Sequence, residues 1–335
     1  MRKLTIIVFL FFSLFSYCDL RIVAVGDVML GSTYPDQCLP TQKELEKITK
    51  ELNSLMPEAE IKLFNLEGTL IEQGKPAKKG KQVYHFAIPP SYARYFKMMG
   101  FNVASINNNH IMDFGWEGCL NTMKILESHG INCTGPKGKI AEFSLSGRRI
   151  AIIAFGYLYD DRFYSILDIE SSKQTIRALK RKHDIIIVSF HGGAEGNPKI
   201  ENRMEEYLGE KRGNVVAFCR AVVDAGASLV IGHGPHLPRA IELYKGKLIV
   251  YSLGNFFTYG RFDIRGAYGY APMLYVVLDN EGNFKEGLII PFVQRGRGIP
   301  HYDKNGKAIR WIKGLTERYF PNTTLEINDD GSIKK

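Results

Sequence analysis

The stretch that decides the fold is Asn102-Val-Ala-Ser-Ile-Asn-Asn-Asn-His-Ile-Met-Asp-Phe-Gly115. It begins with a short apolar run, residues 103–106, and continues into three asparagines and a histidine. Asparagine amides compete with the backbone for hydrogen bonds, so this block is poor material for a helix or a strand. We therefore predict a loop at the end of a buried strand, with amide oxygens and an imidazole available to a ligand.

The same pattern, an apolar run followed by a polar residue, occurs five more times. The runs are residues 21–26 before Asp27, 61–64 before Asn65 and Glu67, 184–190 before His191, 228–231 before His233 and His236, and 248–251 before Asn255. Short apolar runs separated by helical patterns predict buried strands of an α/β sheet. Ligands of such sheets bind outside the carboxyl ends of the strands. The sequence therefore predicts that carboxylates, an amide and imidazoles meet at one edge, as in a metal site.

Length and charge limit the alternatives. The chain has 335 residues, 45% of them hydrophobic and 24% charged, with a formal net charge of +9. This is an ordinary globular composition, and the chain is long enough for one large α/β domain or two small ones. We predict one domain over residues 19–300, with residues 301–335 packed on it or trailing from it. The positive charge suits a polyanionic partner, although a merely basic surface explains it equally well. No basic block with interleaved aromatics is present, so we expect no nucleic-acid partner.

The N-terminus predicts export. Residues 1–3 are positively charged and residues 4–17 form an apolar run that is too short to span a bilayer comfortably. We expect residues 1–18 to be an export signal and the protein to be periplasmic or in the cell envelope. Lipid attachment at Cys18 is an alternative, although Phe15-Ser16-Tyr17 matches a lipoprotein box poorly. Membrane contact is then expected only through the signal or the lipid.

Several other patterns predict structure. We expect helices at residues 41–55, 89–99, 116–129 and 213–225, and strands at 272–277 and 287–293 that complete a second sheet. His129 should cap the end of its helix. The glycines after His191 suggest that the backbone approaches another group closely. Four cysteines follow Cys18 without any Cys-x-x-Cys pair, which argues against a thiolate zinc site; they are Cys38, Cys119, Cys133 and Cys219.

Individual side chains leave alternatives open. Asp27 is either a metal ligand or the cap of a turn. Two histidines three residues apart in Gly232-His-Gly-Pro-His236 are hard to explain by core packing, so we predict metal ligation. Arg239 either holds an anionic oxygen or forms a structural ion pair. Glu195 is a ligand, a base or, as we favour, a hydrogen-bonded neighbour of the ligands.

The ordered motifs resemble the CapA family of capsule, or poly-γ-glutamate, biosynthesis proteins, which is related to the calcineurin-like metallophosphatases. The resemblance covers residues 20–260, and its motifs are Gly26-Asp27-Val-Met-Leu-Gly31, Asn65-Leu-Glu67, Asn108-Asn109-His110 with Asp113-Phe-Gly115, His191 with Glu195, Gly232-His233-Gly-Pro-His236, and Ser252-Leu-Gly-Asn-Phe256. It implies a four-layer α/β/β/α metallophosphatase-like sandwich with a divalent-metal centre at the strand ends.

The resemblance also implies residue roles. Asp27 and His236 would serve one metal, Glu67 would bridge, and a second metal would bind Asn109, His191 and His233. His110 would be the catalytic histidine that protonates a leaving group, oriented by Asp113. We expect Asn108, Glu195, Arg239 and Asn255 to contact substrate or to support the ligands.

The chain departs from the family pattern in four places. Met29 stands where the phosphatases have a histidine in Asp-x-His, and Glu67 replaces an aspartate. Gly192 and Gly234 replace a tryptophan and a histidine that are common in CapA sequences. We therefore expect one metal ion, or an unequal pair, of Mn, Fe or Zn.

Two hypotheses of different class follow. The first is an exported metal-dependent hydrolase that acts on a phosphoester or on an amide of an anionic polymer. The second is a non-catalytic subunit that binds polymer or other surface-polymer synthesis proteins. Fold analogy alone does not choose between them.

Overall fold

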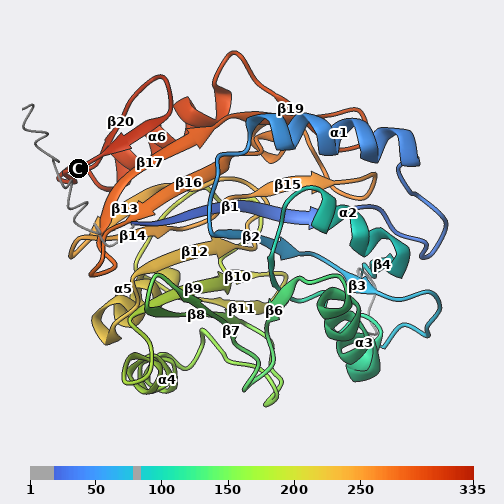
Figure 1. The fold of residues 1–335 in the computed structure, drawn as a ribbon, viewed down its shortest axis with the longest axis horizontal. Coiled ribbons are helices and arrows are strands. Elements are labelled where there is room, and N and C mark those ends of the chain that lie inside the picture. Colours follow the sequence, from blue (N-terminus) through green and yellow to red (C-terminus); the bar gives the residue numbers. More distant parts are fainter. Residues whose placement is uncertain (1–18, 78–83) are drawn as a thin grey trace, which may run out of the picture.

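The computed structural model describes residues 19–77 and 84–335. The predicted export signal, residues 1–18 with Cys18, lies outside the described residues. Two main β-sheets face each other, and helices cover their outer faces (Figure 1).

The larger sheet has nine strands within the described residues, in the order β20-β21-β17-β16-β1-β2-β5-β6, with β15 also paired to β1. Their bounds are β1 (Leu20–Met29), β2 (Ile61–Leu66), β5 (Val103–Ser105), β6 (Asn132–Thr134), β15 (Asn255–Thr258), β16 (Met273–Leu278), β17 (Phe284–Ile290), β20 (Glu326–Ile327) and β21 (Ser332–Lys334). β2 and β15 run parallel to β1, and β5 and β6 continue the parallel part, whereas β16 is antiparallel to β1.

The smaller sheet has the order β13-β14-β12-β9-β8-β7. Its bounds are β7 (Ala141–Leu145), β8 (Arg148–Gly156), β9 (Ile185–His191), β12 (Leu229–His233), β13 (Ile241–Tyr244) and β14 (Lys247–Val250). The four inner strands are parallel and the two edge strands are antiparallel to their neighbours. Both sheets therefore contain a block of parallel strands whose carboxyl ends can share one edge.

Alternation along β1 separates the layers. Ile22 and Ala24 enter the core between the two sheets, whereas Val23 and Val25 face the other way into a core shared with helices. Those helices are α1 (Gln42–Leu55), α2 (Ala93–Met98) and α3 (Gly115–Ser128). A third core lies between the smaller sheet and α4 (Ile169–Lys180) with α5 (Val215–Ala225). In Figure 1, α1 and α4 lie on opposite sides of the paired sheets. The predicted four-layer α/β/β/α sandwich is confirmed.

The C-terminal strands correct one prediction. Residues 272–277 and 287–293 were expected to complete the second sheet, but β16 pairs with β1 of the larger sheet and β17 pairs with β16. The second run is also divided at Pro291, which separates β17 from β18 (Phe292–Arg295), and β18 forms a hairpin with β19 (Ile299–Tyr302). Proline has no backbone N–H to donate to a sheet ladder, so a strand break at this position is expected.

Residues after 302 pack on the sandwich. Helix α6 (Lys307–Tyr319) inserts Ile309 and Ile312 into the core between the sheets. Strand β21 extends the larger sheet by pairing with β17. The remaining short elements are β3 (Thr69–Leu70), β4 (Ala87–Ile88), β10 (Glu205–Tyr207), β11 (Glu210–Gly213), and the 3₁₀ turns η1 (Pro90–Tyr92) and η2 (Gly266–Gly269).

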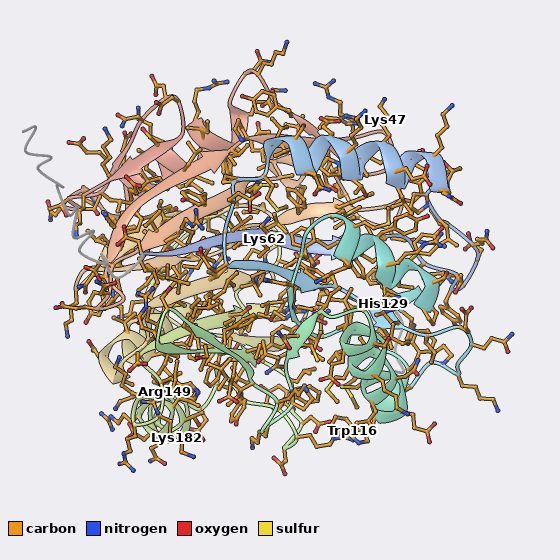
Figure 2. All side chains as sticks on the ribbon, viewed as in Figure 1. Lys47, Lys62, Trp116, His129, Arg149 and Lys182 are labelled. Carbon is orange, nitrogen blue, oxygen red and sulfur yellow. The ribbon has the colours of Figure 1, made fainter. Side chains whose placement is uncertain are left out.

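The side chains of the outer layers include one predicted helix cap and several exposed basic residues. His129, at the end of α3, approaches the Ile125 carbonyl with Nδ1 at 2.9 Å, as predicted for a capping residue (Figure 2). The labelled basic residues Lys47, Arg149 and Lys182 are exposed; Lys47 lies on α1, whereas Arg149 and Lys182 lie near each other beside α4.

The predicted cysteine and membrane features can be checked only within the described chain. Cys38, Cys119, Cys133 and Cys219 are all free thiols. Among the described helices, none combines the length and apolar character needed to cross a bilayer.

Candidate metal centre

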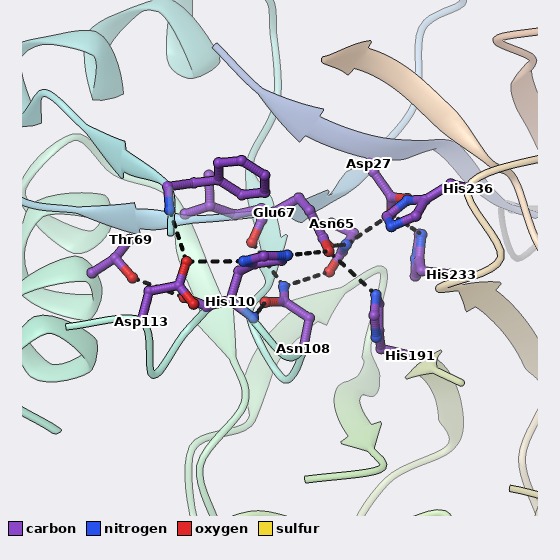
Figure 3. A network of polar contacts seen from close by, with 12 residues as sticks. Asp27, Asn65, Glu67, Thr69, Asn108, His110, Asp113, His191, His233 and His236 are labelled. Atoms are coloured by element: carbon purple, nitrogen blue, oxygen red, sulfur yellow. Dashed lines mark hydrogen bonds and ion pairs between the residues drawn. The ribbon is translucent and has the colours of Figure 1, made fainter. Parts of the chain in front are cut away.

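Strand register brings the predicted residues to one edge. In the larger sheet Asp27 pairs with Asn65 on one side and with Asn255 on the other. In the smaller sheet His233 pairs with His191. Just before these ends, Ser189 Oγ donates to Ser105 Oγ at 2.8 Å and joins the sheets. The strand ends therefore deliver carboxylates and amides from one sheet and imidazoles from the other (Figure 3).

Asp27 is fully buried and both its oxygens are engaged. Oδ1 accepts a hydrogen bond from Asn65 Nδ2 at 2.8 Å, and Oδ2 lies 2.8 Å from His236 Nδ1. His233 Nδ1 lies 3.6 Å from Oδ1. These contacts all reach across the site, so the alternative that Asp27 caps a local turn is wrong.

Glu67 lies at the middle of the cluster. Its Oε2 accepts from Asn65 Nδ2 at 2.5 Å, while Oε1 faces His191 Nε2 at 3.5 Å and His110 Nε2 at 3.8 Å. Burial alone would raise the pKa of Glu67, but the His191 imidazole at 3.5 Å, together with the charge of His110, holds it well below its usual range. Glu67 therefore remains an anionic oxygen ligand at neutral pH.

The Asn108–Asp113 loop positions one histidine. His110 Nδ1 lies 2.9 Å from Asp113 Oδ2, which also accepts the Phe86 backbone N–H at 2.8 Å. The Phe86 ring covers the imidazole, with 4.3 Å between the ring centroids. Because the carboxylate accepts at Nδ1, the proton there is held and Nε2 faces Glu67. His110 is thus oriented to exchange a proton on the Glu67 side.

The two asparagines before His110 differ in what they contact. Asn108 donates to Asn65 Oδ1 at 3.0 Å and to the Leu66 carbonyl at 2.8 Å, and its Oδ1 accepts the His110 N–H at 3.0 Å. It is therefore a support for the loop. Asn109 Oδ1, in contrast, is buried without a hydrogen-bond partner among the described residues.

Unpartnered ligand atoms gather at this edge. Within the described chain, the buried side-chain atoms that lack a hydrogen-bond partner include Glu67 Oε1, Asn109 Oδ1, Asn255 Oδ1 and both ring nitrogens of His191 and His233. Unpaired buried polar atoms are rare because each is costly. Ligand atoms of Asp27, Glu67 and His191 lie within 4.8 Å of one another.

The spacing of these atoms also fits an ion. Two ligand atoms about 2.1 Å from one tetrahedral ion stand roughly 3.4 Å apart. The Glu67 Oε1–His191 Nε2 distance of 3.5 Å and the Asp27 Oδ1–His233 Nδ1 distance of 3.6 Å are close to that value. The residues present therefore fit a divalent metal ion.

The two histidines His233 and His236 have pKa values that are shifted in opposite directions. Burial lowers the pKa of His233 to about 4, so the ring is neutral and can offer a lone pair. Burial would also lower the pKa of His236, but the hydrogen bond and charge of Asp27 raise it to about 9. His233 is thus prepared to bind an ion, whereas His236 forms a charged pair with Asp27.

Arg239 has a structural contact. Its guanidinium is fully buried, with Nη1 and Nη2 donating to both oxygens of Glu205 at 2.9 and 2.8 Å and Nε donating to the Asn197 carbonyl at 2.7 Å. Of the two alternatives, the structure favours the ion pair over contact with a substrate anion.

Glu195 is half-buried, and its side chain makes no hydrogen bond with the described residues. Its charge contributes to the raised pKa of His236, which places it beside the cluster. Asn255 Nδ2 donates to the Tyr268 carbonyl at 3.4 Å, and its oxygen belongs to the unpartnered set.

The departures from the family pattern are connected. A Cβ added to Gly234 would lie 2.8 Å from the carbonyl oxygen of Gly192, and Gly192 N donates to the His233 carbonyl at 2.9 Å. A side chain at position 234 would therefore meet the turn that carries Gly192, whereas a side chain at position 192 would meet Ile166 and the Arg212 carbonyl. Met29 packs in the core between the larger sheet and the helices, and its sulfur accepts from Gly31 N at 3.1 Å.

Three residues of this region were given no role from sequence. Asn65 links Asp27 and Glu67, and its place between two strand-end carboxylates was a usable signal. Phe86 covers His110 but follows no strand. Tyr157 stacks on His191 with 5.7 Å between ring centroids, and it directly follows Gly156 at the end of β8.

A four-layer α/β/β/α sandwich with buried carboxylate, amide and imidazole groups at the strand ends defines a metallophosphatase-like fold. The family model described as bacterial capsule synthesis protein PGA_cap matches residues 21–259. The chain belongs to this family.

Individual relatives agree with that assignment. The chain is 28% identical over 247 residues to the PGA biosynthesis protein CapA of Bacillus subtilis, covering 69% of this chain and 61% of the relative. It is 25% identical over 256 residues to the capsule biosynthesis protein CapA of Bacillus anthracis, covering 71% and 59%. The chain thus spans about three-fifths of the length of these relatives. A putative 5'-nucleotidase structure from Staphylococcus aureus covers 89% of this chain and 58% of its own, with 13% identity and a TM-score of 0.49.

Proposed function

We propose that the protein is a divalent-metal-dependent hydrolase of capsule or poly-γ-glutamate synthesis, acting on a phosphoester or on an amide of an anionic polymer. One observation carries this proposal: the unpartnered Glu67 Oε1 lies 3.5 Å from the unpartnered His191 Nε2 and 3.8 Å from Nε2 of His110, which Asp113 orients. A histidine aimed at ligand atoms is expected for catalysis and is not needed for a structural metal site.

The ion would be held chiefly by Glu67, Asn109, His191 and His233, with Asp27 Oδ1 adjoining it at 3.6 Å from His233 Nδ1. Asp27 and His236, expected to serve a first metal, bind each other at 2.8 Å, and the Asp27 Oδ1 atom accepts from Asn65. This difference supports one ion or an unequal pair. The mixed oxygen and nitrogen donors suit Mn, Fe or Zn.

The chain's own residues supply the remaining chemistry. A divalent ion would polarise a phosphoryl or carbonyl oxygen and lower the pKa of water. His110 would donate a proton from Nε2 to the leaving group, while Asp113 holds Nδ1 and keeps the ring in place. Phe86 shields the His110 ring from solvent and, through its backbone N–H, holds Asp113.

The setting remains part of the proposal. Residues 1–18 would export the chain to the periplasm or cell envelope, with Cys18 as a candidate lipid attachment site. The substrate would be an anionic polymer or a phosphoester, and other surface-polymer synthesis proteins are candidate partners because the relatives are named for that process.

A non-catalytic polymer-binding or assembly subunit is the second candidate. The observation that favours it is the core position of Met29, which leaves the first metal position without the imidazole that the phosphatases have there. In that case the same ligands would hold an ion that only stabilises the strand ends.

Metal content and turnover test the proposal together. The purified protein would be measured by elemental mass spectrometry beside a His191→Ala, His233→Ala double variant, then assayed on a phosphodiester, a phosphomonoester and a γ-glutamyl amide. We expect bound Mn, Fe or Zn that the double variant loses, with metal-dependent turnover of one substrate. A protein that binds metal but hydrolyses none of them supports the assembly role, and one that stays metal-free after reconstitution overturns both metal-based functions.

A further inference from the structure

Four side chains form a stack that leads away from His191. The ring of Tyr157 stacks on His191 at 5.7 Å, with 27° between the ring planes. Arg212 lies over the Tyr157 ring with Cζ at 4.2 Å from the centroid, and over the Tyr207 ring at 5.3 Å. Cation–π contacts of this kind hold a guanidinium in place without using its hydrogen-bond donors.

Two donors in this stack have no acceptor. Tyr157 is 4% exposed and Arg212 is 6% exposed, yet Tyr157 Oη and Arg212 Nε make no hydrogen bond within the described residues. Both atoms are buried, so bulk solvent does not compensate for the missing partners. Each group is a donor, and one of them carries a permanent positive charge.

A second cluster of the same composition shows what a structural arrangement looks like here. Arg220 lies 5.3 Å over the Tyr244 ring, and its Nε and Nη2 donate to Glu242 at 3.1 and 2.7 Å. Tyr251 Oη donates to the same carboxylate at 2.7 Å. The acceptor that satisfies both an arginine Nε and a tyrosine hydroxyl in that cluster is a carboxylate. Among the described residues no carboxylate accepts from Tyr157 Oη or from Arg212 Nε.

The fold builds the Tyr157–Arg212 pair into the candidate metal centre. Tyr157 follows Gly156, whose register partner is His191. The Arg212 carbonyl accepts the Gly193 N–H at 2.8 Å, and a Cβ on Gly192 would lie 2.9 Å from the same carbonyl oxygen. The turn after His191 thus packs directly on Arg212, as its glycines predicted.

The existing partner of Arg212 is exchangeable. Its Nη2 lies 2.9 Å from Glu210 Oε2, but the Glu210 side chain is 57% exposed. Because the Glu210 carboxylate is open to water, it loses little when it leaves Arg212, so an oxyanion that reaches the buried face of the guanidinium can compete with it.

We propose that Tyr157 and Arg212 form an oxyanion-binding subsite beside His191, which takes a carboxylate or phosphate group of the substrate. This deepens the proposed function, because the oxyanion would belong to the polymer or phosphoester that the metal centre hydrolyses. The division of chemistry is complementary: the centre offers acceptors to a cation, whereas the subsite offers donors to an anion. Binding an anion next to the reacting bond fixes the substrate's orientation.

Anion binding tests the subsite separately from turnover. Isothermal titration calorimetry would measure inorganic phosphate and γ-glutamylglutamate binding to the protein as purified and after chelation of metal. Tyr157→Phe keeps the ring stack and removes only the hydroxyl, and Arg212→Lys keeps the charge and removes the planar fork. The matched controls are Tyr251→Phe and Arg220→Lys in the remote cluster.

We expect one probe to bind both before and after chelation, about 10-fold or more weaker in each subsite variant and unchanged in the controls. Preference for phosphate or for the dipeptide identifies which oxyanion is used. Binding that is equal in Tyr157→Phe and wild type, binding that disappears with the metal, or no binding of either probe overturns the subsite. If Arg212→Lys fails to fold, Tyr157→Phe decides alone.

The two proposals fail in different ways. Variant-sensitive anion binding without hydrolysis retains the subsite and removes the hydrolase. Metal-dependent hydrolysis, together with anion binding that is unchanged in Tyr157→Phe and Arg212→Lys, retains the hydrolase and removes the subsite.

Discussion

His236 Nδ1 lies 2.8 Å from Asp27 Oδ2, and both side chains are buried. The contact joins the first strand of the larger sheet to the loop after β12 of the smaller sheet, 209 residues later. His236 has φ 59°, a conformation uncommon for residues other than glycine, which the loop maintains at this contact. The pair therefore connects the two sheets and places a buried charged contact at one side of the site.

The pair makes the stability of chelated protein depend on pH. His236 has a pKa of about 9 in the fold, whereas the ordinary value of a histidine is 6.5. Because the folded protein holds the His236 proton more tightly than the unfolded chain does, this group stabilises the fold. The stabilisation is fully present below pH 6.5 and is lost as the pH rises through 9. We expect the free energy of unfolding to fall by at most about 3 kcal/mol across that window. Urea unfolding of wild type and His236→Gln checks this, because the variant should be nearly flat there; parallel profiles would contradict the assignment.

Asn65 holds two carboxylates together, and replacing it should expose their repulsion. Its Nδ2 donates to Asp27 at 2.8 Å and to Glu67 at 2.5 Å. Asn65→Asp introduces a third carboxylate, so we expect chelated protein to lose about 2–4 kcal/mol of stability. Added Mn or Zn should restore most of this loss, because a cation neutralises the cluster.

Asn65→Leu is the control for that experiment. It removes the donors without adding charge, so its melting temperature should recover less on metal addition than that of Asn65→Asp. Equal stability of Asn65→Asp and wild type under chelation would show that Asn65 does not hold the carboxylates.

The sequence predicted the strand ends well because their physics is local. Buried parallel strands are continuous apolar runs, so residues 184–190 and 228–231 could be recognised without knowing their neighbours. Placing His191 and His233 at one edge then needed only the rule that parallel strands share their carboxyl edge. The four-layer fold followed from the resemblance, because the continuous apolar run of β1 does not show which side chains face which layer.

Pairings that depend on distant segments could not be predicted. The sequence of residues 272–277 does not indicate that β16 pairs with β1 rather than with a strand of the other sheet. Arg239 finds Glu205 on a separate hairpin, so sequence left its two alternatives open. The missing partner of Tyr157 Oη is likewise a property of the packed structure, since in sequence the residue reads as one more aromatic after a strand.

His110 and Asp113 should affect turnover without affecting metal content. His110→Asn removes the proton donor, and we expect metal-dependent hydrolysis to fall by about 100-fold or more. Asp113→Asn should cost roughly 10–100-fold, because the amide no longer holds Nδ1 as a charged acceptor. Steady-state kinetics with elemental analysis of each variant measures both quantities. Loss of the metal in His110→Asn would instead make His110 a ligand.

Gly234 should be intolerant of a side chain for two separable reasons. Its φ of +115° is strained for any L residue, and an added Cβ would lie 2.8 Å from Gly192 O and 3.0 Å from Gly192 N. Gly234→Ala should therefore lose about 2–4 kcal/mol of stability and weaken metal binding by roughly 10-fold or more, because the turns that carry His233 and His191 must separate. Gly138→Ala is the matched control, since Gly138 has φ +82° but nothing within 4 Å of the added Cβ. This variant should lose only the stability that the strained backbone costs, about 1 kcal/mol, and its metal affinity should be unchanged. Urea unfolding and competition with a chromophoric chelator separate the two effects, and similar losses in both variants would show that contact between the two glycines does not position the ligands.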